Sequence, residues 1–157
     1  MRQAGTLALA IFLLAGSGAV QGSNATAGFM CTPTPEDELG PLYQPGAAVR
    51  NTIGTGYLLF GQIRSAGDCS AIPQAKIEIW MAGPDGVYGE SWRATLYSAD
   101  NGRYYLQSHR PPGYGTGRPH IHIKVSAEGF APLVTQHYPL NGAGEALFDL
   151  VLIPLEK

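Results

Sequence analysis

The chain contains 157 residues, of which 21 are glycine and 12 are proline, and its formal net charge is −2. Charged residues make up 14 % of the sequence and hydrophobic residues 45 %. This composition argues against a helical bundle, a disordered chain and, because the basic residues are scattered, a nucleic-acid-binding protein. It favours one compact, turn-rich, all-β domain with a hydrophobic core of its own.

The first residues have the pattern of a secretory signal peptide. Arg2 is followed by an apolar run from Leu7 to Ala15, and small residues follow as far as Gly22. The alternative is a membrane anchor, but the apolar run is much shorter than the roughly 20 residues that a spanning helix needs. We therefore expect residues 1–22 to be a signal peptide, with cleavage between Gly22 and Ala27, and the mature protein to be secreted or periplasmic.

The chain contains only two cysteines, Cys31 and Cys69. An oxidising compartment favours joining them in a disulfide, which would attach the N-terminal segment to the domain. In the loop-entropy description such a bridge stabilises the fold by roughly 3–4 kcal/mol. The alternative is two separate free thiols.

The segment from Cys31 to Asn51 is expected to be irregular. Its prolines cannot donate the hydrogen bonds of a regular ladder, and Glu36-Asp37-Glu38 makes it acidic. We interpret this segment as an ordered arm that wraps the domain.

Beyond the arm, short strand-like runs follow one another at regular intervals. Most contain β-branched or aromatic residues and end at Gly, Pro, Asn or Asp. Asp100-Asn101-Gly102 predicts a hairpin with a type I′ turn. The pattern predicts a single antiparallel β-sandwich of about seven strands with an irregular N-terminal arm. The predicted strands are Tyr57–Arg64, Ala75–Met81, Arg93–Ser98, Arg103–Gln107, Pro119–Val125, Pro132–Tyr138 and Glu145–Ile153.

The run His120-Ile121-His122-Ile123-Lys124-Val125 carries the most specific chemical signal. Residues two apart in a strand point to the same face, so the isoleucines face the core and the two histidines project together from the other side. Two neutral imidazoles in this arrangement can bind one metal ion. A solvated strand face that merely contains two histidines is the alternative.

Two tyrosines lie in Gly- and Pro-rich segments where an aromatic residue has little packing reason to be. Tyr88 belongs to the loop 83–89, and Tyr114 follows Pro111-Pro112-Gly113. If both phenols reach the imidazole pair, the donors are two oxygens and two nitrogens without a thiolate. Anionic phenolates favour a hard, highly charged ion, so ferric iron fits better than zinc or Cu(I).

In this order of motifs the chain resembles the intradiol ring-cleavage dioxygenases, the family that includes protocatechuate 3,4-dioxygenase and catechol 1,2-dioxygenase, and in particular its compact exported branch. The resemblance runs from about Cys31 to Tyr138 and gives residues 29–157 as the family's β-sandwich domain. The motifs that carry it are Thr34-Pro35, Gly40-Pro41-Leu42-Tyr43, Ile79-Trp80, Gly86-Val87-Tyr88, Arg110-Pro111-Pro112-Gly113-Tyr114, His120-Ile121-His122 and Thr135-Gln136-His137-Tyr138.

The resemblance implies a non-haem Fe(III) enzyme that inserts both atoms of O2 into a catechol-type substrate. The ring would open between the two hydroxylated carbons and give a cis,cis-muconate-type diacid. The implied metal ligands are Tyr88, Tyr114, His120 and His122, and the implied partners of the reacting substrate are Arg118 and Gln136. The family usually has an arginine three residues before its first ligand histidine, whereas Arg118 precedes His120 by two and Gly117 has that place.

Two other functions compete with this interpretation. A copper or zinc protein built on the histidine pair would need further ligands, and only His109 and His137 remain. A non-catalytic exported β-sandwich could retain the scaffold as a binding module. The expected partners are a small aromatic diol and O2, with a homo-oligomer as a further possibility, and neither nucleic acid nor, after signal cleavage, a membrane is expected.

Overall fold

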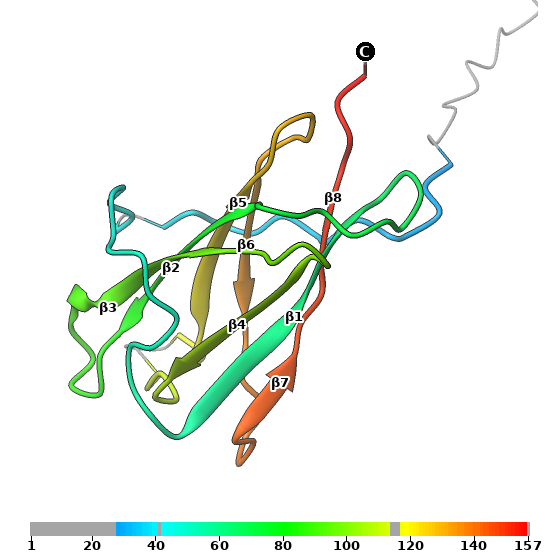
Figure 1. Cartoon of the computed structure of the whole chain (residues 1–157). Helices are drawn as coiled ribbons and strands as arrows, with labels where there is room; N and C mark the ends of the chain where they lie inside the picture. Colours follow the sequence, from blue (N-terminus) through cyan, green and yellow to red (C-terminus); the bar gives the residue numbers. More distant parts are fainter. Residues whose placement is uncertain (1–27, 41, 114–116, 157) are drawn as a thin grey trace, which may run out of the picture.

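The computed structural model describes residues 28–40, 42–113 and 117–156, and its regular elements there are all β-strands (Figure 1). None of these residues forms a helix that could cross a membrane. The eight strands are β1 (Tyr57–Ser65), β2 (Lys76–Ala82), β3 (Tyr88–Tyr97), β4 (Arg103–Ser108), β5 (Ile121–Ser126), β6 (Leu133–His137), β7 (Glu145–Leu147) and β8 (Leu150–Leu152).

The strands form two sheets that pack face to face. One sheet has the order β3-β2-β5-β6, and the other has the order β4-β1-β7, with β8 pairing to the later part of β1. Alternate residues of β1 and β4 are buried between the sheets, as the period of two in a strand requires. The all-β sandwich that the sequence predicts is confirmed. The fully buried core includes Leu59, Ile63, Ile79, Leu106, Ile121, Ile123 and Leu150.

The C-terminal run differs in detail from the predicted antiparallel arrangement. The expected strand at 145–153 is divided into β7 and β8, and both pair with β1 in parallel. The division falls at Phe148 and Asp149, where the Phe148 amide still donates to the Phe60 carbonyl and the Asp149 carboxylate accepts from the Gln62 amide. The Asp149 side chain therefore takes the place of a backbone acceptor at the break.

The hairpin predicted at Asp100-Asn101-Gly102 is wrong. The chain does turn tightly there, with the Gly102 amide donating to the Ala99 carbonyl at 2.7 Å. A type I′ turn needs a positive φ at both central residues, but neither Asp100 nor Asn101 at the centre of this turn has one, and the positive φ of 74° belongs to Gly102 after them. The strands on either side, β3 and β4, belong to different sheets, so this turn carries the chain from one layer of the sandwich to the other.

The N-terminal arm is ordered, as the sequence predicts, and it crosses the outer face of the β3-β2-β5-β6 sheet. The Asp37 amide donates to the Val134 carbonyl of β6, and the Thr95 amide of β3 donates to the Ala48 carbonyl, both at 2.9 Å. Because the core covers one face of β2 and the arm covers the other, every residue of β2 after Lys76 is buried.

A disulfide between Cys31 and Cys69 fixes the start of the arm. Their Cα atoms are 5.3 Å apart, and the two cysteines are 38 positions apart in the sequence. The Met30 amide adds a hydrogen bond to the Ala66 carbonyl, directly after β1. The predicted disulfide is confirmed, and it ties the arm to the connection between β1 and β2.

Candidate metal centre

Strand β5 and the residues before it bring two imidazoles together outside the core. Ile121 and Ile123 are fully buried between the sheets. His122 therefore projects from the opposite face of β5, and His120, just before the strand, lies on the same side. The two Nε2 atoms are 3.0 Å apart. The sequence predicts that the two histidines share a face, and the structure shows that their ring nitrogens are also in direct contact.

The orientation of the His120 ring is fixed by its own backbone neighbourhood. Its Nδ1 atom lies 2.7 Å from the carbonyl oxygen of Arg118. A carbonyl oxygen can only accept, so Nδ1 carries the proton and donates it. In the neutral ring, Nε2 then has a lone pair, which faces the Nε2 atom of His122.

His122 is enclosed from two sides. Its ring stacks on Trp80, the residue paired with it across β2 and β5, with centroids 4.9 Å apart and planes only 2° from parallel. The arm passes over the ring edge at Gly40, where a Cβ atom would lie 3.1 Å from His122 Cε1. Burial, followed by repulsion from His120, lowers the pKa of His122 to about 4, so the imidazole is neutral at pH 7.

Tyr88 brings a phenol to the imidazole pair. Its Oη atom is 3.3 Å from His120 Nε2, and its ring centroid is 6.1 Å from that of His122. The sequence predicts that Tyr88 lies in a loop, but it is the first residue of β3. It pairs with Ala82 after an irregularity in the β2 register, so it enters the site from a strand end.

The remaining predicted phenol, Tyr114, lies outside the described residues. Among the described residues no group of three or more His, Cys, Asp or Glu side chains could hold a metal ion. The described donors are instead two imidazoles and one phenol, with the His122 Nε2 atom and the Tyr88 hydroxyl both within hydrogen-bonding distance of His120 Nε2.

The amino-acid sequence is similar to that of known enzymes. No protein-family model matches the sequence. Catechol 1,2-dioxygenase of Acinetobacter baylyi is 32 % identical over 150 residues, which cover 71 % of this chain and 47 % of that enzyme. Catechol 1,2-dioxygenase of a Pseudomonas species is 31 % identical over 148 residues, with 71 % and 48 % coverage. The chain thus spans about half the length of the curated relatives that it matches.

The fold agrees with this sequence similarity. The intradiol ring-cleavage dioxygenase of Tetranychus urticae superimposes with a TM-score of 0.72 at 17 % identity, covering 81 % of this chain and 97 % of that one. Catechol 1,2-dioxygenase of Acinetobacter sp. ADP1 superimposes with a TM-score of 0.67 at 25 % identity, covering 78 % and 63 %. The chain belongs to the intradiol ring-cleavage dioxygenase family.

The fold also matches a solved dioxygenase domain over the whole length of that domain. The dioxygenase domain of a dioxygenase and carbohydrate-binding protein fusion from Streptomyces sp. SirexAA-E has a TM-score of 0.71 at 24 % identity. The alignment covers 79 % of this chain and all of that domain. The β-sandwich alone is therefore enough to make up a solved structure with this fold.

Arg118 lies at the outer rim of the imidazole pair of this intradiol family member. Its guanidinium carbon is 4.8 Å from the centroid of the Tyr138 ring, and its side chain is otherwise exposed. Tyr138 in turn donates its hydroxyl to Asp37 of the arm at 2.8 Å. This stacking gives the Arg118 cation a fixed support beside His120, whose ring is 6.1 Å from that of Tyr138.

Gln136 is the register partner of His122 on β6. Its side-chain amide donates to the Glu38 carbonyl at 3.0 Å and lies 3.4 Å from an Asp37 carboxylate oxygen. Gln136 is therefore next to the candidate site, but its amide hydrogens are used to hold the acidic part of the arm.

Sequence reasoning did not assign roles to the residues behind His122. Tyr43 of the arm packs edge-on against Trp80 at 5.0 Å and donates its hydroxyl to Glu78. Lys124 donates to the Tyr43 hydroxyl at 3.1 Å. The sequence does contain one sign of this cover. The alternation of side chains in residues 75–81 puts the large apolar Trp80 on the outward face of the strand, which indicates that another segment covers it.

The other two histidines lie apart from the pair. His109 has Nε2 2.9 Å from the Ala82 carbonyl and packs on the edge of Trp92. His137 contacts the Tyr57 hydroxyl at 2.7 Å on the core side of β6. Both rings already have structural partners, which argues against a copper or zinc site that uses them as further ligands.

Proposed function

We propose that the protein is a non-haem Fe(III) intradiol dioxygenase that cleaves a catechol-type ring between its two hydroxylated carbons. Both atoms of O2 enter the product, a cis,cis-muconate-type diacid. The observation that carries the proposal is the convergence of His120 Nε2, His122 Nε2 and the Tyr88 hydroxyl, with Nε2 atoms 3.0 Å apart. Family membership supports it, since the matched Acinetobacter baylyi relative is named as a catechol 1,2-dioxygenase.

The donor chemistry fits ferric iron. The neutral His122 ring and the Nε2 atom of His120, whose Nδ1 donates to the Arg118 carbonyl, can each offer a lone pair, and a phenol next to a trivalent cation loses its proton. Tyr88 and Tyr114 as phenolates, with His120 and His122, would hold the ion, and the two negative charges would reduce the cost of burying it. When bound, the ferric ion supplies Lewis acidity toward a catecholate and makes the ring reactive toward O2.

The protein residues then have separate tasks. The phenolate oxygen of Tyr88 or Tyr114 would take up one of the two catechol protons and a hydroxide ion at the site the other, so no further protein base is needed. Trp80 and Gly40 hold the His122 ring in one orientation. The Arg118 guanidinium, supported on Tyr138, stabilises negative charge that develops on the opening ring. Gln136 contributes by fixing the arm beside the substrate, with its amide bonded to Glu38.

Export is part of the proposal. Residues 1–22 would act as the signal peptide, and the domain 29–157 would function in the periplasm or outside the cell. The Cys31–Cys69 disulfide supports this placement, because disulfides persist in oxidising compartments. Residues 1–27 lie outside the described part of the chain.

Product analysis tests the reaction. The iron-loaded protein is incubated with catechol under isotopically labelled O2, and the product is identified by mass spectrometry and ultraviolet absorption. We expect a ring-opened diacid that contains both labelled oxygen atoms. A semialdehyde from cleavage beside the diol, or no oxygen uptake by a protein that holds iron, would rule out the proposed reaction. Tyr97→Phe, which changes an exposed tyrosine, serves as the control variant.

A further inference from the structure

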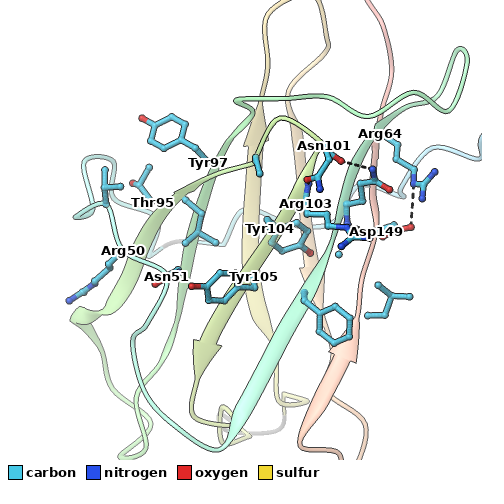
Figure 2. Close-up of a pocket in the computed structure, with 17 residues that line it drawn as sticks. Arg50, Asn51, Arg64, Thr95, Tyr97, Asn101, Arg103, Tyr104, Tyr105 and Asp149 are labelled. Atoms are coloured by element: carbon cyan, nitrogen blue, oxygen red, sulfur yellow. Dashed lines mark hydrogen bonds and ion pairs between the residues drawn. The ribbon is translucent and has the colours of Figure 1, made fainter.

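A groove of about 960 Å³ lies away from the imidazole pair, on the other sheet (Figure 2). Its floor is the outer face of β1 and β4, with Phe60, Gln62 and Tyr105 among its lining residues. Its rim includes the end of the arm at 49–51 and the last part of β3. This volume lies within the range of about 300–1,000 Å³ that small-molecule sites occupy.

The groove exposes aromatic and aliphatic side chains that a solvated sheet face does not require. Tyr105 is 51 % exposed, Tyr97 49 % and Leu147 67 %, and all three line it. Neighbouring exposed apolar side chains on a monomer often mark a binding surface. Flat rings with a polar hydroxyl edge are well suited to stack on another ring.

The groove is also cationic, although the whole chain has a net charge of −2. Arg50, Arg64 and Arg103 line it, and Asp149 is the only acidic residue among the described residues that line it. Figure 2 shows Arg50 at one end and the Arg64–Asp149 pair at the other, with Tyr105 between them. The contacts of the groove arginines leave most of this positive charge uncompensated.

The contacts of the individual arginines show why positive charge remains uncompensated in the groove. Arg50 donates to the backbone carbonyls of Glu90 and Arg93, which position its cation without neutralising it. Arg64 reaches Asp149 only at 3.5 Å, and the same carboxylate accepts from the Gln62 amide at 2.9 Å. The side chain of Arg103 has no hydrogen bond or ion pair within the part of the chain that the structure describes.

We propose that this groove is a second binding site, and that its ligand is an aromatic carboxylate. The ring lies against Tyr105, and the carboxylate accepts hydrogen bonds from the guanidinium of Arg103. Arginine is the side chain whose planar fork matches a carboxylate in two parallel hydrogen bonds, and an adjacent tyrosine gives the attached ring a stacking partner. A neutral ligand would leave the cationic excess uncompensated. The site does not depend on the proposed reaction.

Titration of the metal-free protein with 4-hydroxybenzoate, followed by calorimetry, tests the site. This probe has the ring and the carboxylate but lacks the paired hydroxyls of a catechol. We expect Arg103→Gln to weaken binding about tenfold, the effect of losing one charge-assisted hydrogen bond, and Tyr105→Leu to weaken it by a similar factor. The uncharged analogue 4-hydroxybenzyl alcohol should bind at least about tenfold more weakly.

Two matched variants isolate the groove. Gln107→Ala changes an exposed residue on the same strand and face as Arg103 and Tyr105 but outside the groove, and it should bind the probe as the unchanged protein does. Arg118→Gln removes the same charge beside the imidazole pair and should also leave binding unchanged. Circular dichroism on every variant separates loss of the site from loss of the fold.

Several results would overturn the proposal. Unchanged affinity in both Arg103→Gln and Tyr105→Leu would show that the groove does not bind the probe. Loss of binding in Arg118→Gln would move the ligand to the imidazole pair, and equal affinity for the alcohol would remove the role of charge. A concentration-dependent dimer that Tyr105→Leu abolishes would identify a second copy of the chain as the occupant instead.

Discussion

At the residue scale, the candidate centre depends on how tightly the His122 ring is enclosed. Trp80 covers one ring face, and Gly40 of the arm approaches the ring edge with a φ of 72°. A side chain at position 40 would be strained by that backbone conformation and would also press on the imidazole. Gly46, at φ 80° on the same arm, has open space around it. A side chain at position 46 would therefore be strained by the backbone conformation but would press on no neighbour.

This pair of glycines gives a matched prediction. Gly40→Ala and Gly46→Ala should each lower the free energy of unfolding by about 1 kcal/mol, because both place a Cβ in the left-handed region. Only Gly40→Ala should weaken iron binding, by about tenfold, since its Cβ displaces the His122 ring. Chemical denaturation and iron titration measure the two effects. Equal iron affinity in both variants would contradict the enclosure of His122 by the arm.

A second prediction concerns His137, which is 8 % exposed and contacts the Tyr57 hydroxyl. Burial lowers the pKa of His137 from 6.5 to about 4. Below pH 6.5 His137 is protonated in the unfolded chain, whereas in the folded protein it becomes protonated only at about pH 4. The free energy of unfolding therefore falls as pH drops through this window, by up to about 3 kcal/mol.

Urea denaturation of metal-free protein between pH 7 and pH 4 measures that loss. His137→Gln keeps a hydrogen-bonding group beside Tyr57 but cannot titrate, so its stability should fall less steeply with decreasing pH. His122, whose pKa is also lowered, contributes in the same direction in both proteins, and the difference between them isolates His137. Parallel pH profiles would show that His137 does not contribute.

Residue-level prediction from sequence succeeded where it depended on strand parity. His120 and His122 share a face because Ile121 and Ile123 occupy the core, and this follows from local alternation alone. The enclosure of His122 could not be derived this way, because Gly40 reaches the ring from about 80 residues away in the sequence. Burial of a polar group by a distant segment is a property of the tertiary structure.

At the scale of elements, the arm is the part that completes the site. It covers the sheet that carries His122 and is anchored at its start by the Cys31–Cys69 disulfide. Backbone hydrogen bonds at Thr34 and Asp37 attach it to β8 and β6. Because the arm supplies Gly40 and Tyr43 to the surroundings of His122, its anchoring and the geometry of the site are linked.

Removal of the disulfide tests this link. The double variant Cys31→Ser, Cys69→Ser should lose about 3–4 kcal/mol of unfolding free energy, because the unfolded chain regains the entropy of the closed loop. The amide of Asp37 should also exchange faster with solvent, as the arm detaches more often. Unchanged stability, together with unchanged exchange at Asp37, would show that the arm is held without the bridge.

Element order and strand positions followed from the sequence, but the pairing of strands did not. Asp100-Asn101-Gly102 has the composition of a hairpin turn, yet β3 and β4 part into different sheets. Two amphipathic strands joined by a turn can pair with each other or can join the two opposite sheets of a sandwich. A local turn motif does not distinguish these two arrangements. Likewise, β3 starts at Tyr88 because Tyr88 pairs with Ala82 of β2. The exposed residues 89–91 lie between this pair and the regular pairing that begins at Arg93, so the local sequence did not indicate a strand there.

For the whole molecule, the two sheets separate two chemical surfaces. The imidazole pair lies on the outer side of β3-β2-β5-β6, and the cationic groove lies on the outer side of the sheet that contains β1 and β4. The core between them includes the fully buried Leu59, Ile79 and Ile123. Arg103 and Tyr105 on the outer face of β4 are therefore separated from the imidazoles by this rigid core.

This separation predicts that groove variants retain ring cleavage. Arg103→Gln and Tyr105→Leu should keep kcat/KM for catechol within about twofold of the unchanged protein, since differences below about 0.5 kcal/mol are typical of distant surface substitutions. Oxygen-consumption assays on iron-loaded protein measure this ratio. A tenfold fall in either variant, with the fold intact, would show that the two surfaces are coupled.

The most direct test of the account is the visible spectrum of the full chain loaded with Fe(III). Phenolate bound to ferric iron gives a broad charge-transfer band, so the protein should be reddish and its band should shift when catechol is added. Tyr88→Phe should weaken or abolish the band, whereas Tyr97→Phe, at an exposed position in the groove, should leave it unchanged. A protein that stays colourless and takes up no iron, or a band that survives in Tyr88→Phe unaltered, would contradict the assignment of the metal centre.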